Sequence, residues 1–102
     1  MVIATLSMAE RVARAAGVPA RMRREVMLPI VKKTFSNYLE ASADKAFSGP
    51  IARGDVNTIG RHLRALRRVP GAREIYVALA RSALRHLPVR NRRAVARILK
   101  SR

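Results

Sequence analysis

Four side chains that could bind a small polar molecule or transfer a proton lie within residues 53–62: Arg53, Asp55, Thr58 and His62. A guanidinium on a rigid loop can hold a carboxylate or a phosphate through two parallel hydrogen bonds. A histidine can act as an acid or a base near neutral pH. Thr58 and His62 are four residues apart, which places them on one face of a helix. His62 and Arg53 are therefore the candidate catalytic residues, and all four are candidates for binding a substrate.

Each of these residues also has a purely structural interpretation. His62 could be a half-buried histidine that ties its helix to the preceding turn, and it has no carboxylate partner nearby in the sequence. Arg53 could form a salt bridge with Asp55, with Asp44 or with a second copy of the chain. Asp55 is better explained as a helix N-cap than as a catalytic group. A metal site is not expected, because the two histidines are 24 residues apart and lack matching carboxylates.

The turn that carries these residues, Gly49 to Asp55, has a specific order of residue types. Pro50 fixes its own φ angle and disfavours a helical conformation at the residue before it. Gly54 tolerates backbone angles that other residues resist. Asp55 then offers a carboxylate to the free N–H groups of the next helix. The order predicts a structural turn built on Gly49, Pro50 and Gly54 that starts a helix at Asp55.

The rest of the chain has the periodicity of helices and no alternating strand pattern, which predicts a single all-α domain over residues 1–102, a bundle of four to five helices. Gly17 is expected to end the first helix, which begins almost at Met1 without a cap. Pro29 predicts a break or kink near Met27–Leu28. The expected helices are 2–16, a short one at 21–27, 30–41 with Phe35 and Tyr38 in a central position, 55–68, 72–86 with Tyr76 in the core, and a last one capped by Asn91.

The charge is strongly positive: 22 lysines and arginines oppose 6 acidic residues, giving a net charge of +16. A surface of this sign attracts nucleic acid at low salt whatever its function. The stripe Arg61/Arg64/Arg68 and the cluster 90–93 could follow a phosphate backbone, yet stacking aromatics and a recognition-helix pattern are missing. We therefore expect non-specific binding, and keep a small arginine-rich nucleic-acid-binding protein as the alternative function.

Other features limit the class of protein. The sequence contains no cysteine, so disulfides and thiolate metal sites are excluded. No apolar run reaches the length of a membrane span, and the N-terminus lacks the basic region of a signal peptide. A cytoplasmic location is the default prediction. No G-x-G-x-x-G follows a strand, so we expect this chain to bind no dinucleotide by itself.

The segment Ser48-Gly-Pro-Ile-Ala-Arg-Gly-Asp55, followed by Thr58 and His62-Leu63, resembles the signature of the domain of unknown function 2520 family. The flanking segments agree with it: Leu28-Pro29-Ile30-Val31 and Asn37 before the turn, and Tyr76-Val77-Ala78-Leu79-Ala80 after it. The resemblance extends from about Val2 to Leu87.

The resemblance implies the C-terminal helical half of a Rossmann-type, NAD(P)-dependent-oxidoreductase-like protein. Such a half is akin to the dimerisation domains of 6-phosphogluconate-dehydrogenase-like and pyrroline-carboxylate-reductase-like proteins. It implies a homodimer that is not catalytic alone, with NAD(P) bound by a Rossmann-type domain in cis or in trans. The Rossmann half is absent from this chain. In the full context, Arg53, Asp55, Thr58 and His62 would face the shared cleft.

Overall fold

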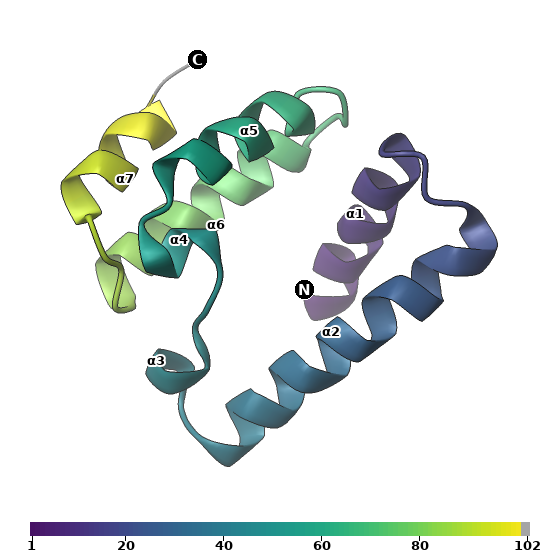
Figure 1. The fold of residues 1–102 in the computed structure, drawn as a ribbon, viewed down its shortest axis with the longest axis horizontal. Helices are drawn as coiled ribbons and strands as arrows, with labels where there is room; N and C mark the ends of the chain where they lie inside the picture. The colour runs from purple at the N-terminus through teal and green to yellow at the C-terminus, as the bar shows by residue number, and fades with distance from the viewer. Residues whose placement is uncertain (101–102) are drawn as a thin grey trace.

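The computed structural model describes residues 1–100 and confirms the all-α prediction (Figure 1). Five longer helices form most of the fold, and two helices of four residues each connect them. The helices are α1 (Val2–Ala15), α2 (Ala20–Glu40), α3 (Ala43–Ala46), α4 (Pro50–Arg53), α5 (Val56–Leu66), α6 (Ala72–His86) and α7 (Arg92–Lys100). No helix among the described residues is long and apolar enough to cross a membrane.

The hydrophobic core lies between α5, α6 and α7. Ile59 of α5 and Val95 of α7 are completely buried, and Leu63 and Leu99 are nearly so. These side chains recur at three- and four-residue steps, so each helix turns one apolar stripe toward the others. The buried hydrophobic residues of the described chain all fall in this part: Ile59, Leu63, Val69, Ala72, Val77, Ala80, Ala83, Val89, Val95 and Leu99.

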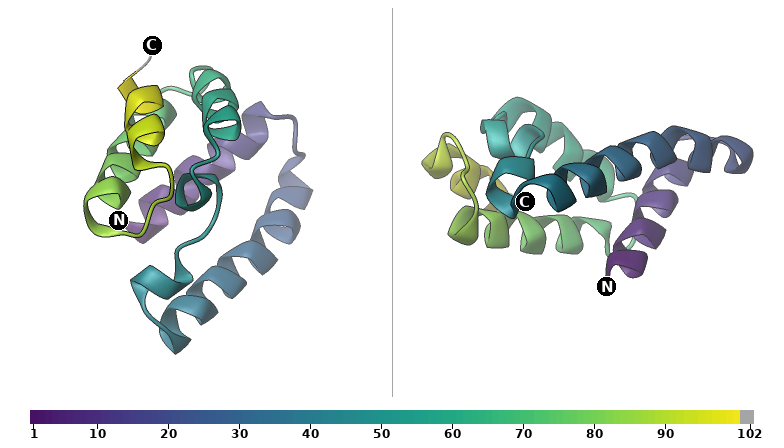
Figure 2. Two further views of the ribbon diagram at one scale, coloured as in Figure 1. Left: turned by 60° about the vertical axis from the view of Figure 1, so that its left-hand side comes forward. Right: turned by 90° about the horizontal axis from the view of Figure 1, so that it is seen from below.

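Helices α1 and α2 lie outside this core. They form a separate pair beside the compact group of α4 to α7 (Figure 2), and no residue of Val2–Ala15 or Ala20–Glu40 is buried. Phe35 is 43% exposed and Tyr38 is 56% exposed. The prediction that their helix is central is therefore wrong for a single chain. The periodicity identifies an apolar face correctly but does not say what covers it.

Helix α2 also contradicts the expected interruption of the chain. It runs without a break from Ala20 to Glu40 with Pro29 inside it. A proline removes one backbone donor, whereas the remaining residues of this 21-residue helix keep theirs. The predicted break near Met27–Leu28 is therefore wrong, and the predicted segments 21–27 and 30–41 are one helix; the alternative of a kink at Pro29 stays a prediction.

The ends of α1 agree with the sequence. Met1 provides no side-chain cap at its start. At its end, Gly17 has a φ of 89°, and the N–H groups of Gly17 and Val18 donate to the carbonyls of Arg14 and Ala13. This is the Schellman pattern, which needs a residue that tolerates positive φ.

Candidate functional site

The turn before α5 contains a helix of its own. Gly49 has a φ of 99°, and Pro50 follows as the first residue of the four-residue helix α4. Gly54 ends α4 in the left-handed conformation, with a φ of 68°. The N–H groups of Gly54 and Asp55 then donate to the carbonyls of Ile51 and Pro50. The structural roles predicted for Gly49, Pro50 and Gly54 thus rest on one tight helical turn between two positive-φ glycines.

Asp55 is the N-cap of α5, as its sequence position predicts. Its Oδ1 accepts a hydrogen bond from the Thr58 backbone N–H at 3.1 Å, and its Oδ2 accepts one from the Thr58 hydroxyl at 2.8 Å. These bonds favour the charged carboxylate, so the Thr58 hydroxyl, followed by the Thr58 N–H, lowers the pKa of Asp55 below its ordinary value. Burial acts weakly in the opposite direction.

Replacing Asp55 with alanine should lower the melting temperature of the protein near neutral pH by about 4–8 °C. Because the folded-state pKa is lowered, the stabilisation by Asp55 is present above its unfolded pKa and disappears as the pH falls through the folded-state value. The difference in melting temperature between the two proteins should therefore shrink in acid. Calorimetry from neutral pH to below pH 4 checks this, and a constant difference would exclude the carboxylate as the cause.

Thr58 links Asp55 to an arginine. Its hydroxyl oxygen accepts a hydrogen bond from Arg61 Nη2 at 3.0 Å while its hydroxyl proton is donated to Asp55. Both carboxylate oxygens of Asp55 are therefore engaged. A carboxylate held in its charged form in this way is a poor general base at neutral pH. In this conformation Asp55 and Thr58 shape and order the start of α5.

His62 contacts a different element from the one expected. It is exposed, and its Nδ1 lies 3.3 Å from the hydroxyl oxygen of Tyr76 on α6. The two rings meet edge to face, with centroids 6.0 Å apart. His62 thus joins α5 to α6 and does not join α5 to the turn. Tyr76 is partly buried, which raises the pKa of its hydroxyl above the ordinary value.

The structure brings two of the four predicted site residues into direct contact, Asp55 and Thr58. Arg53 is exposed at the end of α4, and its positive charge adds to the lowering of the Asp55 pKa. His62 lies one turn of α5 beyond Thr58 and is directed to Tyr76. Arg53 and His62 are therefore the two side chains whose surface exposure would suit contact with another molecule.

Sequence reasoning missed the residues that hold the turn in place. The Arg90 N–H donates to the carbonyl of Ala52 at 3.0 Å, and Asn91 Nδ2 donates to the Gly54 carbonyl at 3.5 Å. Asn91, with a φ of 56°, directly precedes α7, and its carbonyl accepts the Val95 N–H in the first bond of that helix, while its side chain reaches the turn. Its amide side chain and its tolerance of positive φ were the available signal. The segment before α7 is thus bonded to the turn before α5.

One known protein family matches most of this chain. Residues 1–83 match the family model described as domain of unknown function (DUF2520). The chain belongs to that family. The matched range contains the whole turn and all four predicted site residues, Arg53, Asp55, Thr58 and His62. No curated protein and no solved structure gives a significant match.

The DUF2520 match ends inside α6, before the segment that completes the core. Val95 and Leu99 of α7 are 0% and 2% exposed, and Arg90 and Asn91 hold the DUF2520 turn. In this chain, residues beyond the matched range therefore support the signature turn directly. The predicted resemblance to about Leu87 agrees closely with the matched range.

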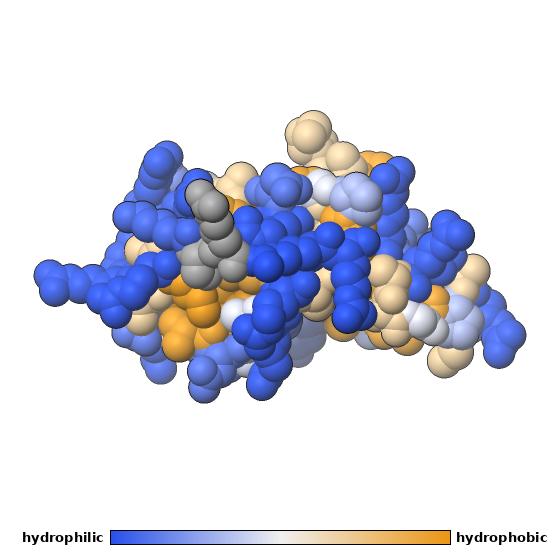
Figure 3. All heavy atoms as spheres, turned by 90° about the horizontal axis from the view of Figure 1, so that it is seen from above, coloured by the Kyte–Doolittle hydropathy of each residue, from blue (hydrophilic) through white to orange (hydrophobic). Residues whose placement is uncertain are grey.

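A metal site and a nucleic-acid interface are the other kinds of site that bear on this DUF2520 chain. Within residues 1–100, no group of three or more histidine, cysteine, aspartate or glutamate side chains could hold a metal ion. The arginines of the α5 stripe are exposed, and Arg61 is bonded to Thr58. Figure 3 shows the face seen from above covered largely by hydrophilic side chains with smaller apolar areas between them.

Proposed function

We propose that this chain is the helical dimerisation and substrate-side domain of an NAD(P)-dependent oxidoreductase-like protein. Membership of the DUF2520 family and the all-helical fold support this function. The chain itself supplies no dinucleotide fingerprint, so the hydride-transfer cofactor would be held by a Rossmann-type domain in cis or in trans.

The observation that carries the proposal is an apolar surface on the outer helices. One continuous hollow is lined by Met1 and by residues of α1, α2 and α6. We term these lining residues the α1–α2 apolar surface: Met1, Val2, Thr5, Leu6, Ile30, Val31, Thr34, Phe35 and Leu79. Ile30 is 65% exposed and Leu79 is 56% exposed. Exposed apolar surface gathered in this way is typical of a protein–protein interface.

The occupant we propose for this surface is a second copy of the chain. The side chains that line this surface carry no charge, so two such surfaces can meet although each copy has a net charge of +16. Pairing would bury residues of α1 and α2, which have none buried in the single chain. Pairing would thus give the two helices a hydrophobic core, which they lack in the single chain.

The substrate-side role rests on the turn and on two exposed side chains, Arg53 at the end of α4 and His62 on α5. The two positive-φ glycines and the Asp55 cap give the turn a fixed shape, and Arg53 is the cation at its edge. In the assembled protein, Arg53 would bind an anionic group of the substrate and His62 would face the same cleft. Asp55 and Thr58 would position them.

The native polypeptide in its source cells tests the oxidoreductase part of this proposal. Antibody capture followed by intact mass spectrometry should find either a polypeptide larger than this chain that contains a dinucleotide-binding fingerprint, or this chain together with a separate Rossmann-type chain. Isolation of this chain alone, with no dinucleotide-binding partner under mild crosslinking, would contradict the proposal.

A further inference from the structure

Two neighbouring hollows on the surface share a pair of arginines. Arg11 and Arg14, one turn apart on α1, line both hollows. The hollow that we term the first is also lined by Arg23 of α2. The second hollow is also lined by Arg68, which follows α5. The fold thus gathers four guanidiniums from three separate parts of the sequence around α1. We term Arg11, Arg14, Arg23 and Arg68 the arginine ridge.

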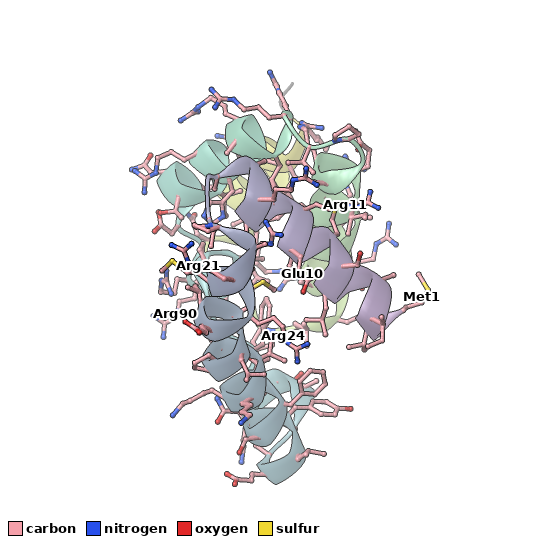
Figure 4. The ribbon with its side chains drawn as sticks, turned by 90° about the vertical axis from the view of Figure 1, so that its right-hand side faces the viewer. Met1, Glu10, Arg11, Arg21, Arg24 and Arg90 are labelled. Atoms are coloured by element: carbon pink, nitrogen blue, oxygen red, sulfur yellow. The ribbon has the colours of Figure 1, made fainter. Side chains whose placement is uncertain are left out.

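The charge of the ridge is poorly neutralised. Glu10 is the acidic residue among the lining side chains of the two hollows. It also lines the seam between α1 and α2 together with Arg24, and Figure 4 shows Glu10 directed toward α2 while Arg11 leaves α1 on another side. Four positive charges held near one another repel, and the attraction of each charge to a bound anion would offset this repulsion.

General features of helices explain only part of this cluster. Arg14 lies in the last turn of α1, where a positive charge is favourable in any protein. Arg23 donates to the Val18 carbonyl at 3.3 Å, which holds its guanidinium beside the start of α2. Neither effect requires Arg11 or Arg68 to line the same hollows.

We propose that this ridge binds a small ligand that carries two or more linked phosphate groups. A guanidinium pairs with two phosphate oxygens at once, so arginine suits this chemistry. A single phosphate in one hollow could reach Arg11, Arg14 and one flanking arginine, Arg23 or Arg68. Linked phosphates can cross the ridge and contact both flanks. The site is separate from the DUF2520 turn and from the α1–α2 apolar surface.

Isothermal titration calorimetry with inorganic tripolyphosphate, in a buffer of about 150 mM ionic strength, tests the site. The unaltered protein should bind tripolyphosphate more tightly than orthophosphate. Replacing Arg11 and Arg14 together by glutamine should weaken tripolyphosphate binding at least about tenfold. The matched control replaces Arg81 and Arg85, two exposed arginines in the second half of α6, by glutamine. It should change tripolyphosphate binding less than about twofold.

A single Arg68→Gln variant provides a second test on an exposed residue outside the helices. It should weaken tripolyphosphate binding more than orthophosphate binding, because a single phosphate can still bind beside Arg11, Arg14 and Arg23. Equal losses in the two double variants would overturn the proposal, because they would indicate attraction to overall charge. Absence of tripolyphosphate binding at this ionic strength would also overturn it. Duplex DNA binding that is tighter than tripolyphosphate binding, lost in the Arg11/Arg14 variant and kept in the Arg81/Arg85 variant, would assign the arginines to nucleic acid instead.

Discussion

Replacing Gly54 with alanine should destabilise the protein by about 3 kcal/mol and lower its melting temperature by roughly 12–24 °C. Two effects add at this position. Gly54 has a φ of 68°, a conformation that costs a non-glycine residue about 1 kcal/mol or more. An added Cβ would also lie 2.7 Å from the Asn91 Cβ and 2.8 Å from the Arg90 backbone carbon. The segment before α7 would have to move, and its bonds to the turn would weaken.

Gly17→Ala is the matched control for Gly54→Ala. Gly17 also has a positive φ, 89°, but nothing lies within 4 Å of an added Cβ. It should therefore show the conformational cost alone, about 1 kcal/mol. Chemical denaturation of both variants measures the two free energies of unfolding. Equal losses would show that contact with Arg90 and Asn91 contributes nothing, and would contradict the bonding of the α7 segment to the turn.

Acidic residues on the α1–α2 apolar surface should separate the proposed dimer. Ile30→Glu and Phe35→Glu together place two charges where the partner's apolar side chains would lie. We expect the dimer dissociation constant to rise at least about a hundredfold, since buried anchors of an interface contribute about 2 kcal/mol or more each. Both residues are exposed in the single chain, so helix content should not change. Sedimentation velocity measures the dissociation constant and circular dichroism measures the helix content.

Ser36→Glu controls for added charge on the same helix. Ser36 is exposed, and at about 100° per residue it lies roughly 120° from Ile30 and 100° from Phe35 around α2, away from the apolar face. This variant should leave the dimer intact. If the Ile30/Phe35 variant dimerises as tightly as the unaltered chain, the α1–α2 apolar surface is not the interface.

The local features of this fold could be predicted from the sequence because each depends on neighbouring residues. Asp55 caps α5 through a residue three positions away, and Gly17 ends α1 through carbonyls of the preceding turn. The helical periodicity of the segments decides the all-α class in the same way. Pro29 is the exception, because α2 continues through it although a proline inside a helix removes one backbone hydrogen bond.

The contacts between distant residues could not be predicted. Asn91 meets Gly54 across 37 positions, and the pairing of His62 with Tyr76 requires the packing of α5 against α6. The arginine ridge combines residues 11, 14, 23 and 68, and each of them alone looks like an ordinary surface charge. The substrate roles of Arg53 and His62 stay predictions, since exposure and position make them suitable and do not identify a ligand.

Sedimentation velocity of the unaltered chain over a wide concentration range tests the dimerisation role most directly. If α1 and α2 form an interface, the chain should sediment as a homodimer and dissociate into monomers only at high dilution. Raising the salt concentration should not weaken the dimer. Salt does not screen apolar contacts, but it does screen the repulsion between two chains that each have a net charge of +16. A monomer at every concentration and salt condition would contradict the proposed dimerisation domain.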